Sequence, residues 1–122
     1  MYAEKHAIAL TTDGAGAATG YSPVVKGRIL AVIYTAVDFD ATADLTITLE
    51  ATGEAILTLT NQAASAVKYP RVPVQDEAGA DALFAAGGTK IREPVVAVND
   101  RVKVVVAQGG AAKTGTITVI VG

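Results

Sequence analysis

The stretch "DRVKVVVAQGGAAKTGTITVIVG", Asp100 to Gly122, contains the pattern that decides the fold. Two runs in which every second residue is aliphatic flank a glycine-rich centre. Side chains alternate between the faces of a β-strand, so each run predicts a strand with one buried face. β-Branched residues dominate both runs and suit a half-buried, pleated surface. The residues predicted to point inward are Val102, Val104, Val106, Ile117, Val119 and Val121.

The same period of two recurs along the chain. "DLTITLE" places Leu45, Ile47 and Leu49 on one face. Turn-forming stretches separate the runs, and no long amphipathic helix lies between them, which disfavours parallel winding. About eight strands in one domain (residues 1–122) predict an all-β, antiparallel sandwich; alternation does not distinguish a jelly-roll order from an immunoglobulin-like one. The further expected strands are Tyr2–Thr11, Tyr21–Val25, Lys26–Val37, Glu54–Asn61, Val67–Val74 and Ile91–Val98.

Two local features go beyond this pattern. The loop "AQGGAAKTGT" (Ala107–Thr116) has the composition of a phosphate-binding loop, but Lys113 follows Ala112 instead of glycine, and a strand follows instead of a helix. We therefore expect a hairpin that joins Arg101–Ala107 to Gly115–Val121. The segment "EAGADALFAAGG" predicts one short helix near residues 80–86, ended by its two glycines.

Composition narrows the function classes. The chain has 122 residues, no cysteine and a net charge of −2. Disulfides and thiolate chemistry are therefore excluded. The ten basic residues are scattered, which argues against nucleic-acid binding. No apolar run approaches the roughly 20 residues that span a membrane. The hydrophobicity comes from Ala and Val, and we interpret it as surface that contacts other protein chains.

The polar motifs predict no cofactor and no catalytic site. Asp38, Asp40 and Asp44 are weak candidates for a hard cation, but the residues around them lack the calcium-loop pattern, and a solvated loop with Phe39 against the core is the better interpretation. His6 is the only histidine, and no nucleophile motif accompanies it. We therefore expect no enzymatic activity.

Contact residues are predicted from prolines and from outward apolar positions. "YPRVP" (Tyr69–Pro73) marks an extended edge segment or arm, because each proline lacks an amide donor. Tyr and Arg are favoured at interface centres. Apolar residues in the water-facing phase of three strands predict a second covered face. The protein-interface candidates are Tyr2, Ile56, Tyr69, Arg71, Val105 and Ile120.

Nearly the whole chain resembles a group of small proteins encoded in the head-gene modules of tailed bacteriophages. The resemblance rests on "MYAEKHAIALTT", "GRILAVIYTA", "DLTITLEATGEAILTLTN", the long run from "YPRVPVQDEAG" to "VVVAQGG", and "KTGTITVIVG". These proteins look like capsid decoration, or cement, proteins. The family has no active-site residues, and none is carried over.

The resemblance implies a virion structural protein on the capsid surface, made in the bacterial host cytoplasm. Its partners would be the major capsid protein and further copies of itself, as a trimer or dimer, without nucleic acid, membrane or cofactor. Two alternatives stay open. One is a neck, tail or fibre component of the virion. The other is a soluble ligand-binding β domain, which would need a concave pocket with convergent polar groups.

Overall fold

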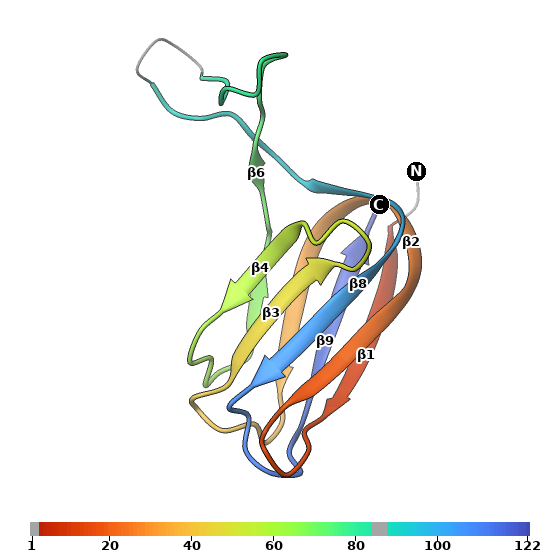
Figure 1. Cartoon of the computed structure of the whole chain (residues 1–122), viewed down its shortest axis with the longest axis vertical. Helices are drawn as coiled ribbons and strands as arrows, with labels where there is room; N and C mark the ends of the chain where they lie inside the picture. Colours follow the sequence, from red (N-terminus) through yellow and green to blue (C-terminus); the bar gives the residue numbers. More distant parts are fainter. Residues whose placement is uncertain (1–2, 84–87) are drawn as a thin grey trace.

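The computed structural model is an all-β fold with a narrow arm that projects from one end of the body (Figure 1). The structure describes residues 3–83 and 88–122. Nine strands lie in this part of the chain, and none of it is helical. In chain order they are β1 (Glu4–Thr11), β2 (Ala18–Ala36), β3 (Asp44–Leu49), β4 (Ala55–Leu59), β5 (Ala66–Lys68), β6 (Val72–Pro73), β7 (Arg92–Glu93), β8 (Val95–Ala107) and β9 (Thr114–Val121).

The longest strand, β2, belongs to two sheets. Its first part, residues 18–28, pairs with β8, and its second part, residues 29–36, pairs with β9. Register shifts interrupt both pairings between residues 21 and 31, and such bulges bend a strand. Figure 1 shows β2 curving over at the end of the body that carries the arm. Gly27 lies in this bend with φ of 115°, a conformation that favours glycine.

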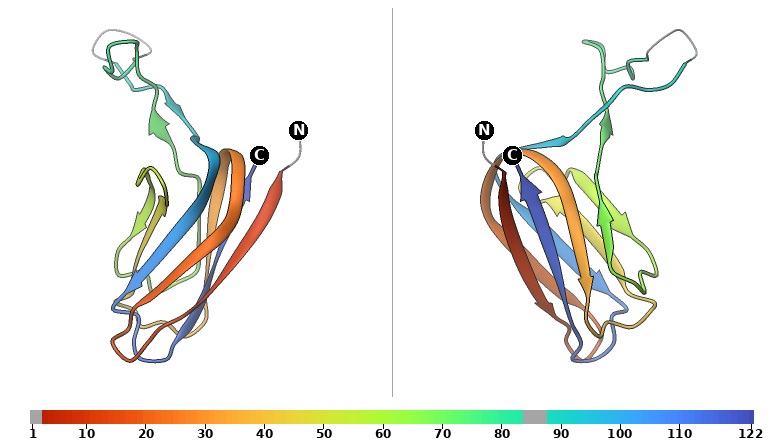
Figure 2. Two further views of the ribbon diagram at one scale, coloured as in Figure 1. Left: turned by 45° about the vertical axis from the view of Figure 1, so that its right-hand side comes forward. Right: turned by 180° about the vertical axis from the view of Figure 1, so that it is seen from behind.

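The bend folds one continuous ladder, β1-β9-β2-β8-β3-β4, into two antiparallel layers. Sheet I contains the first part of β2, then β8, β3 and β4. Sheet II contains β1, β9, the second part of β2, and β5. The two views in Figure 2 show the layers and place the start of β1 and the end of β9 at the end of the body from which the arm leaves. The predicted antiparallel sandwich is therefore confirmed.

The pairing order identifies the sandwich as a jelly roll. When the two parts of β2 count as separate strands, the first strand of the body pairs with the last, β1 with β9. The second pairs with the next to last, the first part of β2 with β8. The third strand, which is the second part of β2, pairs with β5, and the two strands at the centre of the order, β3 and β4, pair with each other. The chain is thus one long hairpin rolled up, which is the jelly-roll arrangement.

The core lies between the two sheets and consists of the inward-facing residues of β1, β2, β3, β4, β8 and β9, with Ala43. Tyr34, Ile29, Leu45 and Ile47 are among its largest buried side chains. All nine inward positions predicted by alternation on β3, β8 and β9 are at most 3% exposed. Aliphatic residues on both layers interdigitate there, and their burial supplies most of the stability of such a domain.

The predicted hairpin between β8 and β9 is wrong. These strands do not pair: β8 lies between β2 and β3 in sheet I, and β9 lies between β1 and β2 in sheet II. The loop between them therefore crosses from one layer to the other. Alternation predicted both strands correctly but carries no information about which strand is the neighbour.

The predicted helix near residues 80–86 is also wrong where the structure describes it. Asp81 bridges to Gln75, and Leu83 bridges to Lys90, so this stretch is part of an antiparallel ribbon. The remainder, residues 84–86, lies outside the described residues. No helix in the described part of the chain has the length and apolar character to cross a membrane.

Candidate interaction surfaces

The glycine-rich loop between β8 and β9 is a structural crossing. The Thr12 hydroxyl donates to the Gly110 carbonyl at 2.5 Å and accepts from the Lys113 amide at 2.8 Å. The Gly109 amide donates to the Gly16 carbonyl at 3.0 Å. These amides, which a phosphate would need, already bind the loop that follows β1. These bonds tie the β8–β9 loop to the loop between β1 and β2, at the end of the sandwich that lies opposite the arm.

The three aspartates of the predicted metal candidate act separately. Asp38 accepts the Thr114 amide at 2.5 Å, and Asp44 accepts the Asn61 amide at 2.9 Å. The Asp40 carboxylate lies against Gly110, where an added Cβ would be 2.7 Å away. Among the described residues, no three acidic or histidine side chains form a group that could hold a metal ion. The carboxylates of Asp38 and Asp44 instead hold loop backbone in place.

The loop that follows β2, with Asp38 and Phe39, has the structure that was predicted: Phe39 lies against the core and Asp38 lies at the surface. Phe39 packs against the core and stacks on Tyr34, with ring centroids 6.3 Å apart, as predicted. The pKa of Asp38 is lowered, chiefly because the Thr114 amide donates to its carboxylate. The Tyr34 hydroxyl is buried without a hydrogen-bond partner, and burial raises its pKa.

His6 and the two serines of the chain have structural partners. The His6 ring is 3.2 Å from Glu4 on the same strand. The buried Ser22 hydroxyl accepts the Val102 amide at 2.9 Å, which ties β2 to β8. The Ser65 hydroxyl accepts the Ala36 amide at 2.9 Å. These contacts hold backbone in place, and none brings a serine to the histidine.

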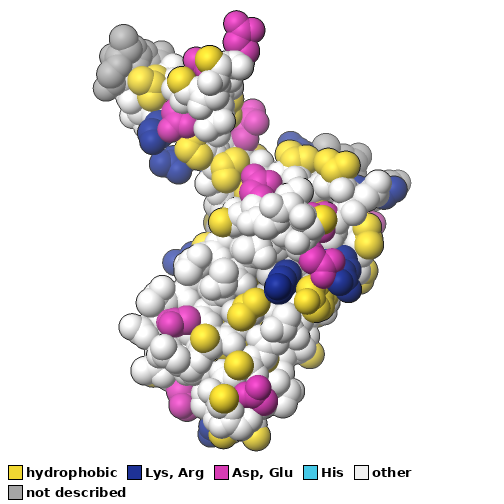
Figure 3. Space-filling view, viewed as in Figure 1, with side chains coloured by type: hydrophobic (Ala, Val, Ile, Leu, Met, Phe, Trp, Pro, Cys, Tyr) yellow, Lys and Arg dark blue, Asp and Glu magenta, His cyan; other side chains and the backbone are white. Residues whose placement is uncertain are grey.

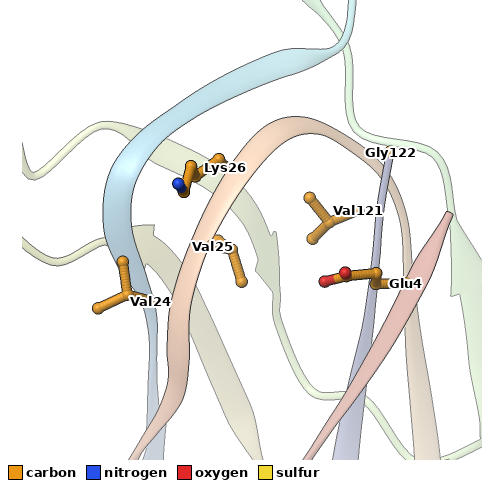
Figure 4. A pocket seen from close by; sticks show the side chains of 6 residues that line it. All are labelled: Glu4, Val24, Val25, Lys26, Val121 and Gly122. Carbon is orange, nitrogen blue, oxygen red and sulfur yellow. The ribbon is translucent and has the colours of Figure 1, made fainter. Parts of the chain in front are cut away.

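A small pocket of about 260 Å³ lies at the bend of β2. Figure 4 shows its six lining residues, with Glu4 on β1 and Lys26 on β2 at opposite sides and Val25 and Val121 between them. The volume is below the roughly 300–1,000 Å³ of sites that enclose small molecules. It offers one carboxylate and one ammonium group, so it gives little support for a ligand-binding domain. The lining residues are Glu4, Val24, Val25, Lys26, Val121 and Gly122.

The arm comprises the described residues of 69–94, and it is a narrow ribbon. β6 pairs with β7, the Val74 amide donates to the Ile91 carbonyl at 2.7 Å, and Lys90 forms an ion pair with Asp81 at 2.9 Å. Arg71 fastens the base of the arm by donating to the Leu30 carbonyl at 3.2 Å. Figures 1 and 2 show that the arm leads away from the sandwich. Pro70 is buried at the base of the arm, and Val72 packs against the core.

The ribbon has two different sides. Cross-strand partners share a side, so the register that pairs Val72 with Glu93 also places Val74 and Ile91 together on that side. The opposite side carries Arg71 and Arg92. One side of the arm is therefore largely aliphatic and the other is basic. A two-stranded ribbon is at best marginally stable in water, so this aliphatic side is suited to a partner surface.

The arm also confirms one prediction from sequence. The segment Tyr69–Pro73 was expected to be an extended arm or edge, and it forms the arm's outgoing strand. Tyr69 is 65% exposed and Arg71 is exposed. Tyr2, another predicted contact, lies outside the described residues.

The three outward apolar positions divide into two correct predictions and one wrong one. Val105 alternates with the buried Val104 and Val106 and lies partly exposed on the outer face of sheet I. Ile120 is likewise partly exposed on sheet II. Ile56 was predicted to face outward, but it is 7% exposed and belongs to the core. The β3–β4 register shifts at this point, and such a shift reverses the face of the residue.

The outer face of sheet II is almost free of charge. The register aligns Lys5, Ala7 and Ala9 of β1 with Ile120, Thr118 and Thr116 of β9. The next strand adds Ile33, which is partly exposed and pairs with Val67, which is 51% exposed. Lys5 is the only charged residue among these positions. Charges are depleted at interface cores relative to the remaining surface, so this face is suited to burial.

Sheet I differs from sheet II because its outer face carries several large hydrophobic residues that are exposed. Four of the eight large hydrophobic residues that are exposed in the described chain lie on β2 and β8. Figure 3 looks onto this side of the molecule and shows basic, acidic and hydrophobic side chains close together on the body, with acidic side chains at the end of the arm. The four residues are Tyr21, Val24, Val96 and Val98.

The geometry therefore consists of a closed core, two sheets with apolar residues on their outer faces and a projecting arm. Comparisons with protein-family models, with curated proteins and with solved structures found no match for this chain.

Proposed function

We propose that this protein is a structural component of a tailed-phage virion, a decoration protein that binds the outside of the head as a homo-oligomer and bridges capsid subunits. The observation that carries the proposal is the arm, a projecting ribbon that adds little to the core. Ordering a chain segment costs about 1–2 kcal/mol per residue in backbone entropy. A segment of this length that packs on the body only near its base, through Pro70 and Val72, is suited to receive its remaining stabilising contacts from another chain.

The remaining surfaces agree with a protein that works by adhesion. Sheet II presents a face with one charge among the positions described above, and sheet I presents exposed valines. Jelly rolls occur in viral capsid domains, and also in lectins and cupins. The fold alone therefore decides nothing, and the proposal depends on the surfaces together with the resemblance to head-module proteins.

The physical mechanism is linkage. A protein that binds the expanded shell and not the immature shell stabilises the expanded state by mass action. At a free concentration of one hundred times Kd this contribution is about 2.7 kcal/mol per site. Because decoration sites recur across the shell, these contributions add up against the outward pressure of packed DNA. The partner is then the major capsid protein, and the location is the capsid surface.

The test uses purified protein and heads assembled from the major capsid protein of the same genome. We expect the protein to co-sediment with expanded heads and not with immature ones. Cryo-electron microscopy should show it on the outer surface. A matched variant, with residues 71–93 replaced by a short glycine–serine linker, should lose most of this binding. Binding to neither form of the head would overturn the proposal.

The number of copies per particle distinguishes a head location from the neck or tail. Hundreds of copies indicate the shell, whereas about six or twelve indicate a ring at the neck or tail. Quantitative mass spectrometry of purified particles measures this number directly.

A further inference from the structure

Exposed hydrophobic residues gather at one place on the body. Tyr21, Val24, Val96 and Val98 are 41, 60, 55 and 75% exposed. The strands that carry them, β2 and β8, are paired neighbours. The residues beside them in sequence, Ser22, Val25, Val95 and Ala97, are buried, so all four point to the outer face of sheet I. We call these four residues the β2–β8 patch.

The charges around the β2–β8 patch are mainly basic. Lys103 pairs in register with Tyr21, and Lys26 follows two residues after Val24. The Arg101 guanidinium lies 4.2 Å from the centre of the Tyr21 ring and is held there by an ion pair with Glu50. Glu4 lies across the pocket from Lys26 and adds one negative charge. Since Arg101 already neutralises Glu50, the two lysines outnumber Glu4, and the rim of the patch keeps a net positive charge.

The tip of the arm has the opposite charge. Asp76 and Glu77 are exposed there, and the Asp76 carboxylate accepts the amides of Ala78 and Ala80 at 2.9 and 3.0 Å. These bonds close the turn and present both acidic residues at its end. Figure 3 shows acidic side chains projecting at this tip. Lys90 is already paired with Asp81 further along the ribbon, so the tip itself has a net negative charge.

We infer that the acidic tip of the arm docks on the β2–β8 patch of a second copy of this chain. The arm leads away from the body that carries it (Figure 2), so its tip is directed toward another molecule. Extended residues from Arg71 to Asp76 span about 20 Å. A four-stranded sheet is about 19 Å wide, so the tip can reach β8 and β2 across a neighbouring sheet I. Charge complementarity then fixes its position.

The contact joins two different surfaces, so it is head-to-tail and generates a ring where the rotation closes. This inference concerns the self-association in the proposed function and specifies its surfaces. Its test uses purified protein without capsids. A negative result in this test would contradict the contact between copies but not capsid binding. A negative result with capsids would contradict the proposed function but not the contact between copies.

The test is a charge reversal on each side of the contact. In one variant Asp76 and Glu77 are both replaced by lysine, and in the other Lys26 and Lys103 are both replaced by glutamate. Analytical ultracentrifugation should show an oligomer for the original chain. Each variant alone should associate at least about tenfold more weakly, because like charges then meet. An equimolar mixture should associate again, since each arm then meets a patch of opposite charge.

Controls separate docking from folding. Circular dichroism should show that both reversed variants keep the fold of the body, because none of the four side chains lies in the core. The mixture controls for the turn that Asp76 closes, since a tip that had lost its turn would not restore association. Val98→Asp should also weaken association, whereas Val37→Asp, at a residue 63% exposed on the opposite end of the body, should leave it unchanged. A monomeric original chain, or reversed variants that associate normally, would overturn the inference. So would a mixture that fails to associate.

Discussion

At the scale of single residues, glycine decides how closely the edges of the two sheets approach. Gly20 on β2 faces β1, and a Cβ added there would lie 2.7 Å from both Ile8 Cγ2 and Leu10 Cδ2. Real Cβ contacts are not that short, so either the core side chains or β1 must move. The absence of a side chain at Gly20 lets sheet I and sheet II close over the core at this edge.

Gly20→Ala should therefore destabilise the protein by about 1–3 kcal/mol, the usual cost of adding volume to a packed core. Urea unfolding followed by circular dichroism measures this difference. Gly14→Ala is the matched control, because no atom lies within 4 Å of an added Cβ in that loop. Equal stability of Gly20→Ala and the original chain would contradict the close approach of the two edges.

Asp38 makes stability depend on pH. Donation from the Thr114 amide, and also from its hydroxyl, lowers the pKa of Asp38 below its ordinary value of 3.8. A carboxyl whose pKa is lower in the folded state stabilises the fold fully above the unfolded pKa. This contribution is lost as pH falls through the folded pKa. Asp13 has a lowered pKa for a similar reason, since the amides of Ala17 and Ala15 donate to it.

We therefore expect the free energy of unfolding to fall as pH drops below 3.8, and Asp38→Asn should make this dependence shallower. Urea titrations at a series of acidic pH values give the slope. Thr114→Val removes the hydroxyl and keeps the backbone amide, so it should retain most of the dependence. A slope that Asp38→Asn leaves unchanged would show that other groups control acid stability.

At the scale of elements, the arm and the body contribute to stability very differently. The body strands share one core, whereas the contacts of the described arm with the body are confined to its base, where Pro70 is buried and Val72 packs against the core. Replacing residues 71–93 by a short flexible linker should therefore leave the melting temperature within a few degrees of the full chain, because a loss near 1 kcal/mol shifts Tm by about that much. Differential scanning calorimetry measures it. A collapse of the transition would show that the arm is part of the folding unit.

Strand positions could be predicted from the sequence, but their neighbours could not. The period of two gave the inward residues of β3, β8 and β9, because burial on one face imposes that period. The loop from Ala107 to Thr116 looked like a hairpin because a glycine-rich turn between two strands has the same composition as a crossing between layers. Ile56 was misassigned because a register shift is invisible in a pattern of residue types.

The arm shows a second limit of local patterns. Alanine-rich residues near 80 have a preference for helix, but the Ala82 amide donates to the Val74 carbonyl and its carbonyl accepts from the Ile91 amide. Pairing between distant segments therefore overrides a weak local preference. The acidic tip and the β2–β8 patch were not predicted either. Both arise from residues that the ribbon and the bend of β2 bring together.

At the scale of the whole molecule, the rolled hairpin makes the contacts non-local. Thr19 on β2 pairs with Val105 on β8, 86 positions later in the chain. Such distant pairing slows folding, because the entropy of closing a long loop is lost before the strand contacts that stabilise the fold can form. The chain ends are nevertheless adjacent, since an added Cβ on Gly122 would lie 3.5 Å from the Ala3 Cα. This geometry allows the order of the strands to be changed without changing the fold.

A circular permutant should therefore fold faster than the original chain. A short glycine linker would join residue 122 to residue 1, and the chain would be opened after Gly79, whose added Cβ would meet no atom within 4 Å. The β1–β9 pair then becomes a local hairpin, and the separation between Thr19 and Val105 is roughly halved. Because closing a shorter loop costs less entropy, we expect folding to accelerate by about tenfold while the core is retained. Stopped-flow refolding from urea measures the rate, and equilibrium unfolding confirms an intact core. A permutant that folds stably but no faster would mean that the distant strand pairs form only after the rate-limiting step.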